Sequence, residues 1–264
     1  MVLFYQPLES WLNFNTSQMK LIYLETLSIL FIACSSQAKI KKELTKEEIY
    51  SNKQAMGPEL SISFEKGSSH NHPSFVIWME DLNGKFIETL FITKSVGTGE
   101  FNYGKTEKGK WVPALKRYPS SLPYWGHRRG ILSSDSLYIP DPQTKTPDAV
   151  TGSTPKSSFI LNTKLSNPEL KEFKIYFEVN QTWDYNEYWT NNKFSDNETY
   201  KASCQPSLIY SANIDLNQTT KTWELQAIGH GHYAGETGEL FENLSTLTTA
   251  KQIAEKITVH LKEN

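Results

Sequence analysis

Cysteine and arginine are both scarce in this chain of 264 residues. The two cysteines, Cys34 and Cys204, are too few for the disulfide framework that holds many small secreted domains together. Arginine supplies three of the 27 basic residues, at Arg117, Arg128 and Arg129, and lysine supplies the rest. The net charge is −2 and the pI is about 6.3, so no global positive field exists to attract nucleic acid.

Familiar catalytic signatures are also missing. The sequence has no Gly-x-Ser-x-Gly elbow, phosphate-binding glycine loop or dinucleotide fingerprint. Asp184, Glu187 and Asp196 lie among aromatic residues, as carboxylates do in carbohydrate sites, and a glycosidase needs two of them at a defined separation. The other interpretation is that these aromatic residues cover one end of the domain. A protein without enzymatic activity is therefore the favoured prediction.

An apolar run near the N-terminus ends at a cysteine. Lys20 gives a positive start, residues 27–33 are largely apolar, and Cys34 follows Ala33. This pattern resembles the lipobox of bacterial lipoproteins, in which the signal is cut before the cysteine that carries the lipid. The run is too short to span a bilayer, which takes about 20 apolar residues. An ordinary buried helix is the alternative interpretation.

The N-terminal pattern also predicts the organisation and the location of the protein. We expect residues 1–18 to be a mis-called start, residues 19–33 a signal peptide beginning at Met19, and Cys34 the lipidated residue. The lysine-rich remainder of residues 34–57 is predicted to be a tether, and residues 58–264 a single domain. Lipid anchoring places the protein outside the cytoplasm, on the periplasmic side of the outer membrane. Cys204 is then expected to be an unpaired, packed residue.

Beyond the tether, apolar residues recur with the period of two that is typical of β-strands. Residues 173–179 alternate so regularly that they predict a strand with one buried face, and residues 75–79 are apolar enough for a strand buried on both faces. Asp81 to Gly84 predicts a hairpin turn that leads into residues 86–92. Further strands are expected over residues 60–64, 208–214, 223–227 and 257–261.

These strands, separated by polar turns, predict an all-β fold. The expected architecture is an immunoglobulin-like or fibronectin-like antiparallel β-sandwich. A parallel sheet would require strands that alternate with helices, and the sequence does not show this alternation. Long loops are expected over residues 97–155 and 182–206, where a sandwich often carries its function. An apolar stripe predicts one short C-terminal helix from Thr248 to Lys256.

The segment from Asp148 to Thr154 suggests a cofactor. It reads Asp-Ala-Val-Thr-Gly-Ser-Thr and resembles the motif at which flavin transferases attach FMN, through a phosphoester to the hydroxyl of the last threonine. Asp148, Thr151, Gly152 and Thr154 match the motif, and Gly152 is expected to let the backbone turn. Ser153 replaces the usual alanine, and a proline follows Thr154. A simple polar turn is the alternative.

The three arginines gather beside aromatic residues. Arg117, Arg128 and Arg129 all lie between residues 117 and 129, in a window that also holds Trp125. Arginine binds phosphate or carboxylate with two parallel hydrogen bonds, and aromatic rings stack on ligands and on guanidinium groups. This cluster is a candidate site for an anionic or ring-bearing ligand, including the phosphate of FMN. Ion pairs with nearby acidic residues are the equally weighted alternative.

Histidine pairs provide a weaker candidate site. His230 and His232, like His70 and His72, are spaced so that two rings project from one face of a strand. Each pair could supply two metal ligands, and a metal site needs at least a third. A tight loop with polar caps is the favoured interpretation of the segment around His230.

Taken together, several segments resemble the periplasmic family catalogued as domain of unknown function 2271. The resemblance covers about residues 60–261 and rests on five segments: 75–85, 111–117, 148–155, 177–184 and 229–250. It implies a small secreted β-sandwich protein that accompanies flavin transferases and membrane proteins of respiratory or metal-reducing systems. Either covalent FMN on Thr154 or an accessory role with such partners is then expected. The alternative is a non-enzymatic binding module for a metal, a carbohydrate or another small ligand.

Overall fold

The computed structural model describes residues 46–262. The domain described below begins at residue 47. The predicted signal peptide, the tether up to residue 45 and the predicted lipidation site Cys34 lie outside the described residues.

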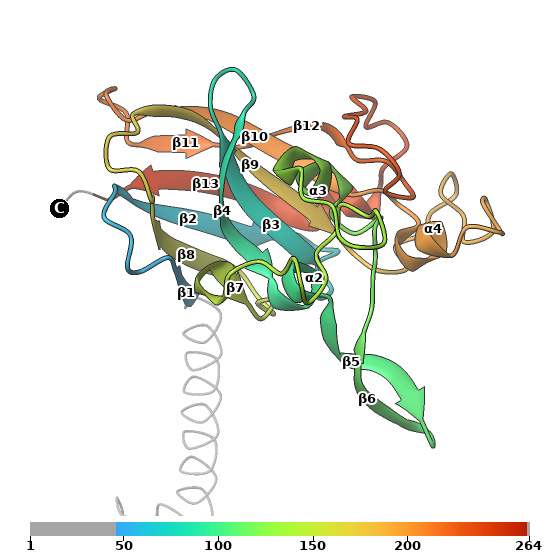
Figure 1. Ribbon diagram of the computed structural model, residues 1–264. Helices are drawn as coiled ribbons and strands as arrows, with labels where there is room; N and C mark the ends of the chain where they lie inside the picture. The colour runs from blue at the N-terminus through green and yellow to red at the C-terminus, as the bar shows by residue number, and fades with distance from the viewer. Residues whose placement is uncertain (1–45, 263–264) are drawn as a thin grey trace, which may run out of the picture. The chain divides into compact units, whose positions relative to one another are not determined.

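Two β-sheets pack face to face, so the prediction of an all-β sandwich is confirmed (Figure 1). The first sheet has the strand order β1 (Glu47–Ser51), β8 (Phe159–Lys164), β2 (Glu59–Lys66), β13 (Ala254–Leu261), β11 (Thr222–Glu224). The second has the order β12 (Gln226–His230), β10 (Leu208–Asp215), β9 (Glu172–Asn180), β3 (Ser74–Glu80), β4 (Phe86–Thr93), β7 (Thr151–Gly152). Within the sandwich, pairing is antiparallel except between β1 and β8 and between β4 and β7, which are parallel.

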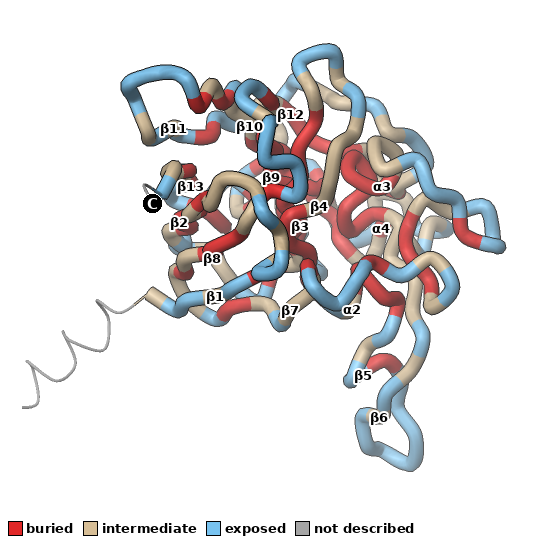
Figure 2. Tube along the Cα trace, turned by 60° about the vertical axis from the view of Figure 1, so that its left-hand side comes forward, coloured by how far each residue is buried: buried red, intermediate tan, exposed pale blue. Residues whose placement is uncertain are grey.

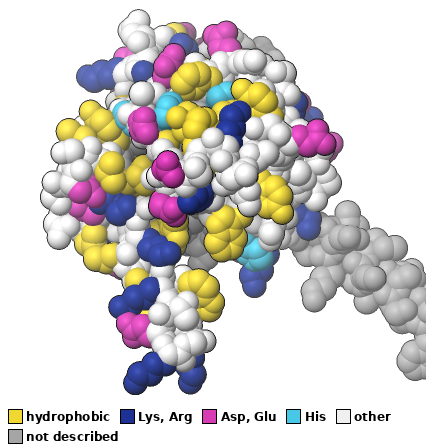
Figure 3. Space-filling model, turned by 90° about the vertical axis from the view of Figure 1, so that its right-hand side faces the viewer, with side chains coloured by type: hydrophobic (Ala, Val, Ile, Leu, Met, Phe, Trp, Pro, Cys, Tyr) yellow, Lys and Arg dark blue, Asp and Glu magenta, His cyan; other side chains and the backbone are white. Residues whose placement is uncertain are grey.

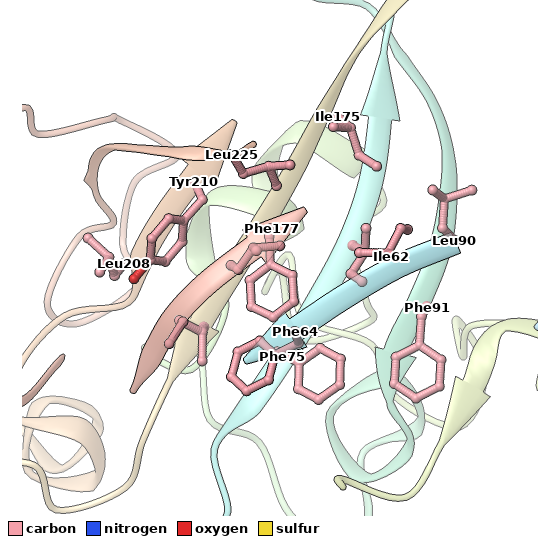
Figure 4. Packing of buried hydrophobic residues seen from close by; sticks show 14 of the residues in the cluster. Ile62, Phe64, Phe75, Leu90, Phe91, Ile175, Phe177, Leu208, Tyr210 and Leu225 are labelled. Atoms are coloured by element: carbon pink, nitrogen blue, oxygen red, sulfur yellow. The ribbon is translucent and has the colours of Figure 1, made fainter. Parts of the chain in front are cut away.

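Phenylalanine rings from both sheets form the centre of the core (Figure 4). Phe64 of β2 stacks on Phe159 of β8 with ring centroids 4.9 Å apart, and Phe75 of β3 stacks on Phe177 of β9 at 5.3 Å. All four side chains are buried. The alternating pattern of the sequence therefore places these rings in the space between the sheets, where burial of apolar area stabilises the fold.

The predicted strand over residues 223–227 is divided between the two sheets. Thr222–Glu224 forms β11 in the first sheet, and Gln226–His230 forms β12 in the second. Leu225 lies between them, buried, and its backbone N–H donates to the carbonyl oxygen of Ile257 at 3.0 Å. The chain therefore crosses from one layer to the other at this leucine.

A short helix covers the outer face of the second sheet. The prediction that the strand over residues 173–179 has only one buried face is therefore wrong. α3 (Pro123–Arg129) lies over β3 and β9 (Figure 1), and Trp125 packs with Val76, Trp78 and Tyr176 in a second apolar cluster. Residues on both faces of β9 are thus buried, including Glu178. Tyr176 and Glu178, which were expected to face solvent, instead contact the helix.

The remaining helices are short. They are α2 (Lys94–Thr98), α4 (Glu198–Ser203) and the 3-10 turns η1 (Asp148–Val150) and η2 (Thr249–Gln252). The helix expected up to Lys256 is only the η2 turn, because β13 begins at Ala254 and pairs with β2. Among residues 46–262 no helix has the length and apolar character needed to cross a membrane.

Two further predictions can be compared with the structure. The hairpin turn is confirmed, since Gly84 has a φ of 85° and donates to the Asp81 carbonyl at 3.0 Å.

The predicted tether ends earlier than residue 57, because Glu47–Ser51 forms β1 and pairs with β8. The loop from residue 97 to 155 contains a separate hairpin, β5 (Glu100–Glu107) and β6 (Lys110–Leu115), which stands apart from both sheets (Figure 2).

Candidate functional site

The segment that resembles a flavin-attachment motif forms an edge of the second sheet. Asp148–Val150 makes the η1 turn, and Thr151–Gly152 forms β7, which pairs with Ile92 and Thr93 of β4. A Cβ on Gly152 would lie 2.8 Å from the Phe91 ring, closer than real side-chain contacts allow. Gly152 is therefore required by the packing of Phe91, which differs from the expected reason, a turn of the backbone.

Thr154 lies just beyond this edge strand and is half-buried. Its Oγ1 is 3.3 Å from Thr93 Oγ1, and Thr93 Oγ1 also accepts the Phe75 N–H at 3.1 Å. The neighbouring Ser153 is exposed. The Thr154 hydroxyl thus has a defined orientation and partial access to solvent.

A groove begins at the start of the same segment. It measures about 310 Å³ and is lined by residues 50–54 on one side and by Asp148 and Ala149 on the other. The Asn52 N–H donates to the Ala149 carbonyl at 2.9 Å and ties the two sides together. A volume of this size lies at the lower end of the range typical of small-molecule sites.

A second hollow of about 230 Å³ adjoins the groove, because Tyr50, Ser51 and Lys53 line both. Asn162 of β8 lines this hollow, and its Oδ1 is buried without a hydrogen-bond partner. A buried, unpaired amide oxygen loses free energy unless a ligand or water donates to it. Lys164 and Glu59 also line this hollow.

An aromatic ring and a cation lie together on the wall of the groove. Lys53 Nζ is 4.8 Å from the centroid of the Tyr50 ring, which is half exposed. The Tyr50 hydroxyl donates to Glu48 at 2.5 Å, and this hydrogen bond raises the pKa of Tyr50 above its usual value. The groove therefore offers a ring face, amide groups and charges of both signs, because Asp148 lines it together with Lys53.

Sequence reasoning missed Tyr50 and Lys53, which line the groove, and Asn162, which lines the adjoining hollow. The first two fall in the segment assigned to a tether, although Ile49 and Ser51 alternate with more exposed neighbours as in an edge strand. That alternation is the one local signal that could have found β1. The contact with Asn162 depends on the parallel pairing of β1 with β8.

The predicted arginine cluster is held mainly by protein groups. Arg128 donates to Glu80 through Nε at 2.7 Å and Nη2 at 2.5 Å, and Nη2 also donates to the Gly84 carbonyl. Arg117 donates to Asp135 at 2.7 Å and to the Ile139 carbonyl. These contacts match the ion-pair interpretation of both residues.

The third arginine and the candidate Trp125 are also engaged. Arg129 donates to the Thr144 carbonyl at 2.7 Å and lies 5.4 Å from the centroid of the Trp125 ring. Trp125 is fully buried and donates to Thr89 Oγ1 at 3.1 Å, so its faces cannot stack on a ligand. Arg117 Nε and Arg129 Nη1 are buried without protein partners and stay available to ordered water or a small anion.

The histidine pair at the end of β12 is tied to the backbone. His230 is buried with Nδ1 2.8 Å from the Gly231 carbonyl oxygen, and burial lowers the pKa of its imidazole. His232 Nδ1 accepts the N–H groups of Ala234 at 3.2 Å and Glu236 at 3.3 Å. Across residues 46–262, no three His, Cys, Asp or Glu side chains are grouped so that they could hold a metal ion.

The loop from residue 182 to 206 combines buried and exposed aromatic residues. Trp189 is buried and covers the end of the sandwich, whereas Trp183 and Tyr185 are 73% and 63% exposed. Asp184 is buried and accepts a hydrogen bond from Thr249, and burial raises the pKa of its carboxyl group. Cys204 is buried and unpaired. Trp189 therefore covers one end of the domain, and the interpretation of this loop as a carbohydrate site stays a prediction.

Comparison with known proteins gives no relative from which a function can be transferred: no family model, curated protein or solved structure matches the chain. The resemblance to the family of domain of unknown function 2271 stays a prediction from the sequence.

Proposed function

We propose that this chain is an extracytoplasmic, lipid-anchored protein of a flavin-dependent electron-transfer system and carries FMN on Thr154. The observation that carries this proposal is the position of the Thr154 hydroxyl, oriented by Thr93 at 3.3 Å and only half-buried, at the end of a segment that borders a groove. Covalently bound FMN would supply reversible electron transfer. An accessory protein that binds a flavinylated partner is the second form of the same proposal.

The residues around Thr154 fit an attached flavin phosphate in two respects. Because Gly152 has no side chain, its strand β7 can pack closely against the Phe91 ring. This packing holds the chain in place two residues before Thr154. Lys94, which directly follows Thr93, is 59% exposed, and its Nζ forms a long ion pair with the Asp148 carboxylate at 3.9 Å. An exposed pair of this length contributes little to stability, so the ammonium group can exchange this partner for a phosphate. The arginines fit this role poorly, because Arg128 and Arg117 are engaged by acidic residues.

The groove supports a place for the ring system of the flavin. Its exposed Tyr50 ring offers a face for stacking, and Lys53 lies beside that ring. In the adjoining hollow, Asn162 adds a buried oxygen that has no protein partner and can accept a hydrogen bond from a ligand.

The test is to produce the chain with and without a flavin transferase and FAD and to measure intact mass and in-gel flavin fluorescence. We expect one covalent FMN on the wild type and none on Thr154→Ala. Ser153→Ala is the matched control, since it removes a neighbouring hydroxyl at the position where the motif usually has alanine, and it should still be labelled. An unlabelled wild type, in a reaction that labels an established acceptor protein, would contradict the carrier proposal.

The accessory form and the location need separate measurements. An accessory protein should bind a flavinylated partner equally well as wild type and as Thr154→Ala. Lipid anchoring predicts that labelled palmitate enters the wild type and not Cys34→Ser.

A non-enzymatic binding module is the second candidate function, and the unpaired Asn162 oxygen at the groove supports it. Titration calorimetry with free FMN and with simple sugars should then show binding that is lost in Tyr50→Ala and Lys53→Ala and is indifferent to Thr154→Ala. Binding that survives both groove substitutions would exclude the groove as the site.

A further inference from the structure

A two-stranded hairpin projects from the sandwich and exposes apolar side chains. β5 and β6 pair only with each other within the described chain, and the connecting residues Lys108 and Gly109 have φ of 49° and 74°, as in a tight hairpin turn. Tyr103, Trp111 and Leu115 are 76%, 60% and 64% exposed. Figure 3 shows the hairpin as a lobe below the sandwich, on which apolar and basic side chains lie side by side.

The base of this hairpin is anchored, so the projection is a built feature. The Lys116 N–H donates to the Gly99 carbonyl at 2.9 Å, and the rings of Phe101 and Tyr118 meet edge to face at 5.1 Å. A Cβ on Gly104 would lie 2.7 Å from the Ala114 carbonyl oxygen, so the two strands approach closely at the bulge. An isolated hairpin is marginally stable in water, and an outward set of large apolar residues does nothing to stabilise it.

Basic residues also concentrate on the hairpin, against the charge of the whole chain. The chain carries a net charge of −2, yet residues 100–116 hold four lysines and two glutamates. Lys105 pairs with Glu107 at 2.6 Å, and Lys108 and Lys110 flank the turn in exposed positions. A positive hairpin on an acidic protein complements a negatively charged surface.

We propose that the β5–β6 hairpin docks on a membrane surface that carries anionic headgroups. Tryptophan and tyrosine prefer the headgroup level of a bilayer, where an apolar ring and a polar edge are both accommodated. Trp111, Tyr103 and Leu115 supply that apolar contact, and the lysines supply attraction to lipid phosphates. The hairpin thus gives the protein a weak, reversible contact with the membrane that is separate from any lipid on Cys34. This inference does not rest on flavin at Thr154.

The experiment measures binding of the full chain to vesicles by sedimentation, in a Cys34→Ser background so that lipid attachment cannot mask the hairpin. Vesicles contain equal parts phosphatidylglycerol and phosphatidylcholine, or phosphatidylcholine alone. We expect stronger binding to the anionic vesicles and a loss of about tenfold or more in Trp111→Ala/Tyr103→Ala. Replacing Lys105, Lys108 and Lys110 by glutamine should reduce binding to the anionic vesicles by a similar factor.

A matched control comes from the other exposed aromatic pair. Trp183→Ala/Tyr185→Ala removes rings that are as exposed as those of the hairpin, and it should leave vesicle binding unchanged. All variants alter exposed side chains, so an unchanged urea unfolding midpoint should confirm that each is folded. Two results would overturn the proposal: no preference of the wild type for anionic vesicles, or equal losses in the hairpin and control variants.

Discussion

At its central strands β3 and β9, the second sheet is buried on both faces, and the two faces differ in chemistry. On the inner face, Phe75 of β3 and Phe177 of β9 pack against the first sheet with other apolar residues. On the outer face, the same two strands present Glu80 and Glu178, which have no exposed surface beneath α3. One strand thus supplies apolar surface to one side and a carboxylate to the other.

The difference shows two ways of stabilising a buried residue. The inner face gains free energy from apolar area removed from water, in proportion to that area. The outer face depends on hydrogen bonds. Glu80 accepts from Arg128 and from Trp78 Nε1, and Glu178 accepts from Ser207 and from the N–H groups of Tyr124 and Trp125. Removing a donor there leaves an unpaired buried charge, whereas removing a ring on the inner face leaves a cavity.

The largest effect is expected from the inner face. Phe177→Ala should lower the free energy of unfolding by about 3–5 kcal/mol, because it removes a fully buried ring that stacks on Phe75 and Phe64. Urea unfolding followed by tryptophan fluorescence measures the change. Phe177→Leu, which keeps most of the volume, should cost less than half as much. Equal costs for the two variants would contradict a close-packed core.

On the outer face, Arg128→Ala should cost about 2–4 kcal/mol, somewhat less than for a fully buried pair because the Arg128 side chain is 32% exposed. The substitution leaves the Glu80 carboxylate buried with only the Trp78 N–H as a side-chain donor. The double variant Arg128→Ala/Glu80→Gln removes the unpaired buried charge and should recover part of the lost unfolding free energy in the same urea assay. A double variant as unstable as the sum of the two single variants would show that the pair is not coupled.

The inner face could be read from the sequence, and the outer face could not. Alternation along residues 173–179 placed Phe177 correctly, because the period of two needs only neighbouring residues. The same alternation assigned Glu178 to solvent. The N–H of Trp125 that covers it comes from 53 positions away in the chain, and no local pattern encodes that contact.

The candidate site divides in the same way. The residues Asp148 to Thr154 form a contiguous motif and were found. Tyr50 and Lys53 were assigned to a tether, because their place beside Asn162 depends on a strand pairing that joins distant segments. Asn52, which donates to the Lys164 carbonyl at 2.9 Å, reaches across 112 positions. Contacts of this range require the topology, and the topology was predicted only as a class.

The pH dependence of stability gives a third, smaller contrast between the faces. Burial raises the pKa of Glu178 to about 7, so the folded protein binds this proton more tightly than the unfolded chain. Stability from this group is therefore present below the usual pKa near 4.5 and is lost as the pH rises towards 7, by about 1–3 kcal/mol in total.

The measurement is the urea unfolding free energy of the wild type and of Glu178→Gln across this pH range. The difference between the two proteins should change with pH between 4.5 and 7 and stay constant above it. A difference that is constant across the whole range would show that Glu178 does not titrate there. Phe177→Leu, on the inner face of the same strand, serves as the control whose difference from wild type should not depend on pH.

The smallest effect concerns a single hydroxyl. Ser207 donates to Glu178 at 2.5 Å, and this hydrogen bond lowers the pKa of the carboxyl group against the effect of burial. Ser207→Ala should cost about 1 kcal/mol at pH 5, where Glu178 is protonated, and more at pH 8, where a carboxylate loses one of its three donors. The control is Ser211→Ala, which removes a hydroxyl that donates to the Ile175 carbonyl at 3.0 Å. Ser211 lies in β10, the strand that begins directly after Ser207, and its loss should cost the same at both pH values. Because the Glu178 pKa must rise when the donor is lost, the pH-dependent window of the Ser207→Ala variant should extend to higher pH than that of the wild type. Equal losses at pH 5 and pH 8 would mean that the Ser207 hydroxyl only fills space on the outer face, and that the contrast with the inner face does not arise from charge.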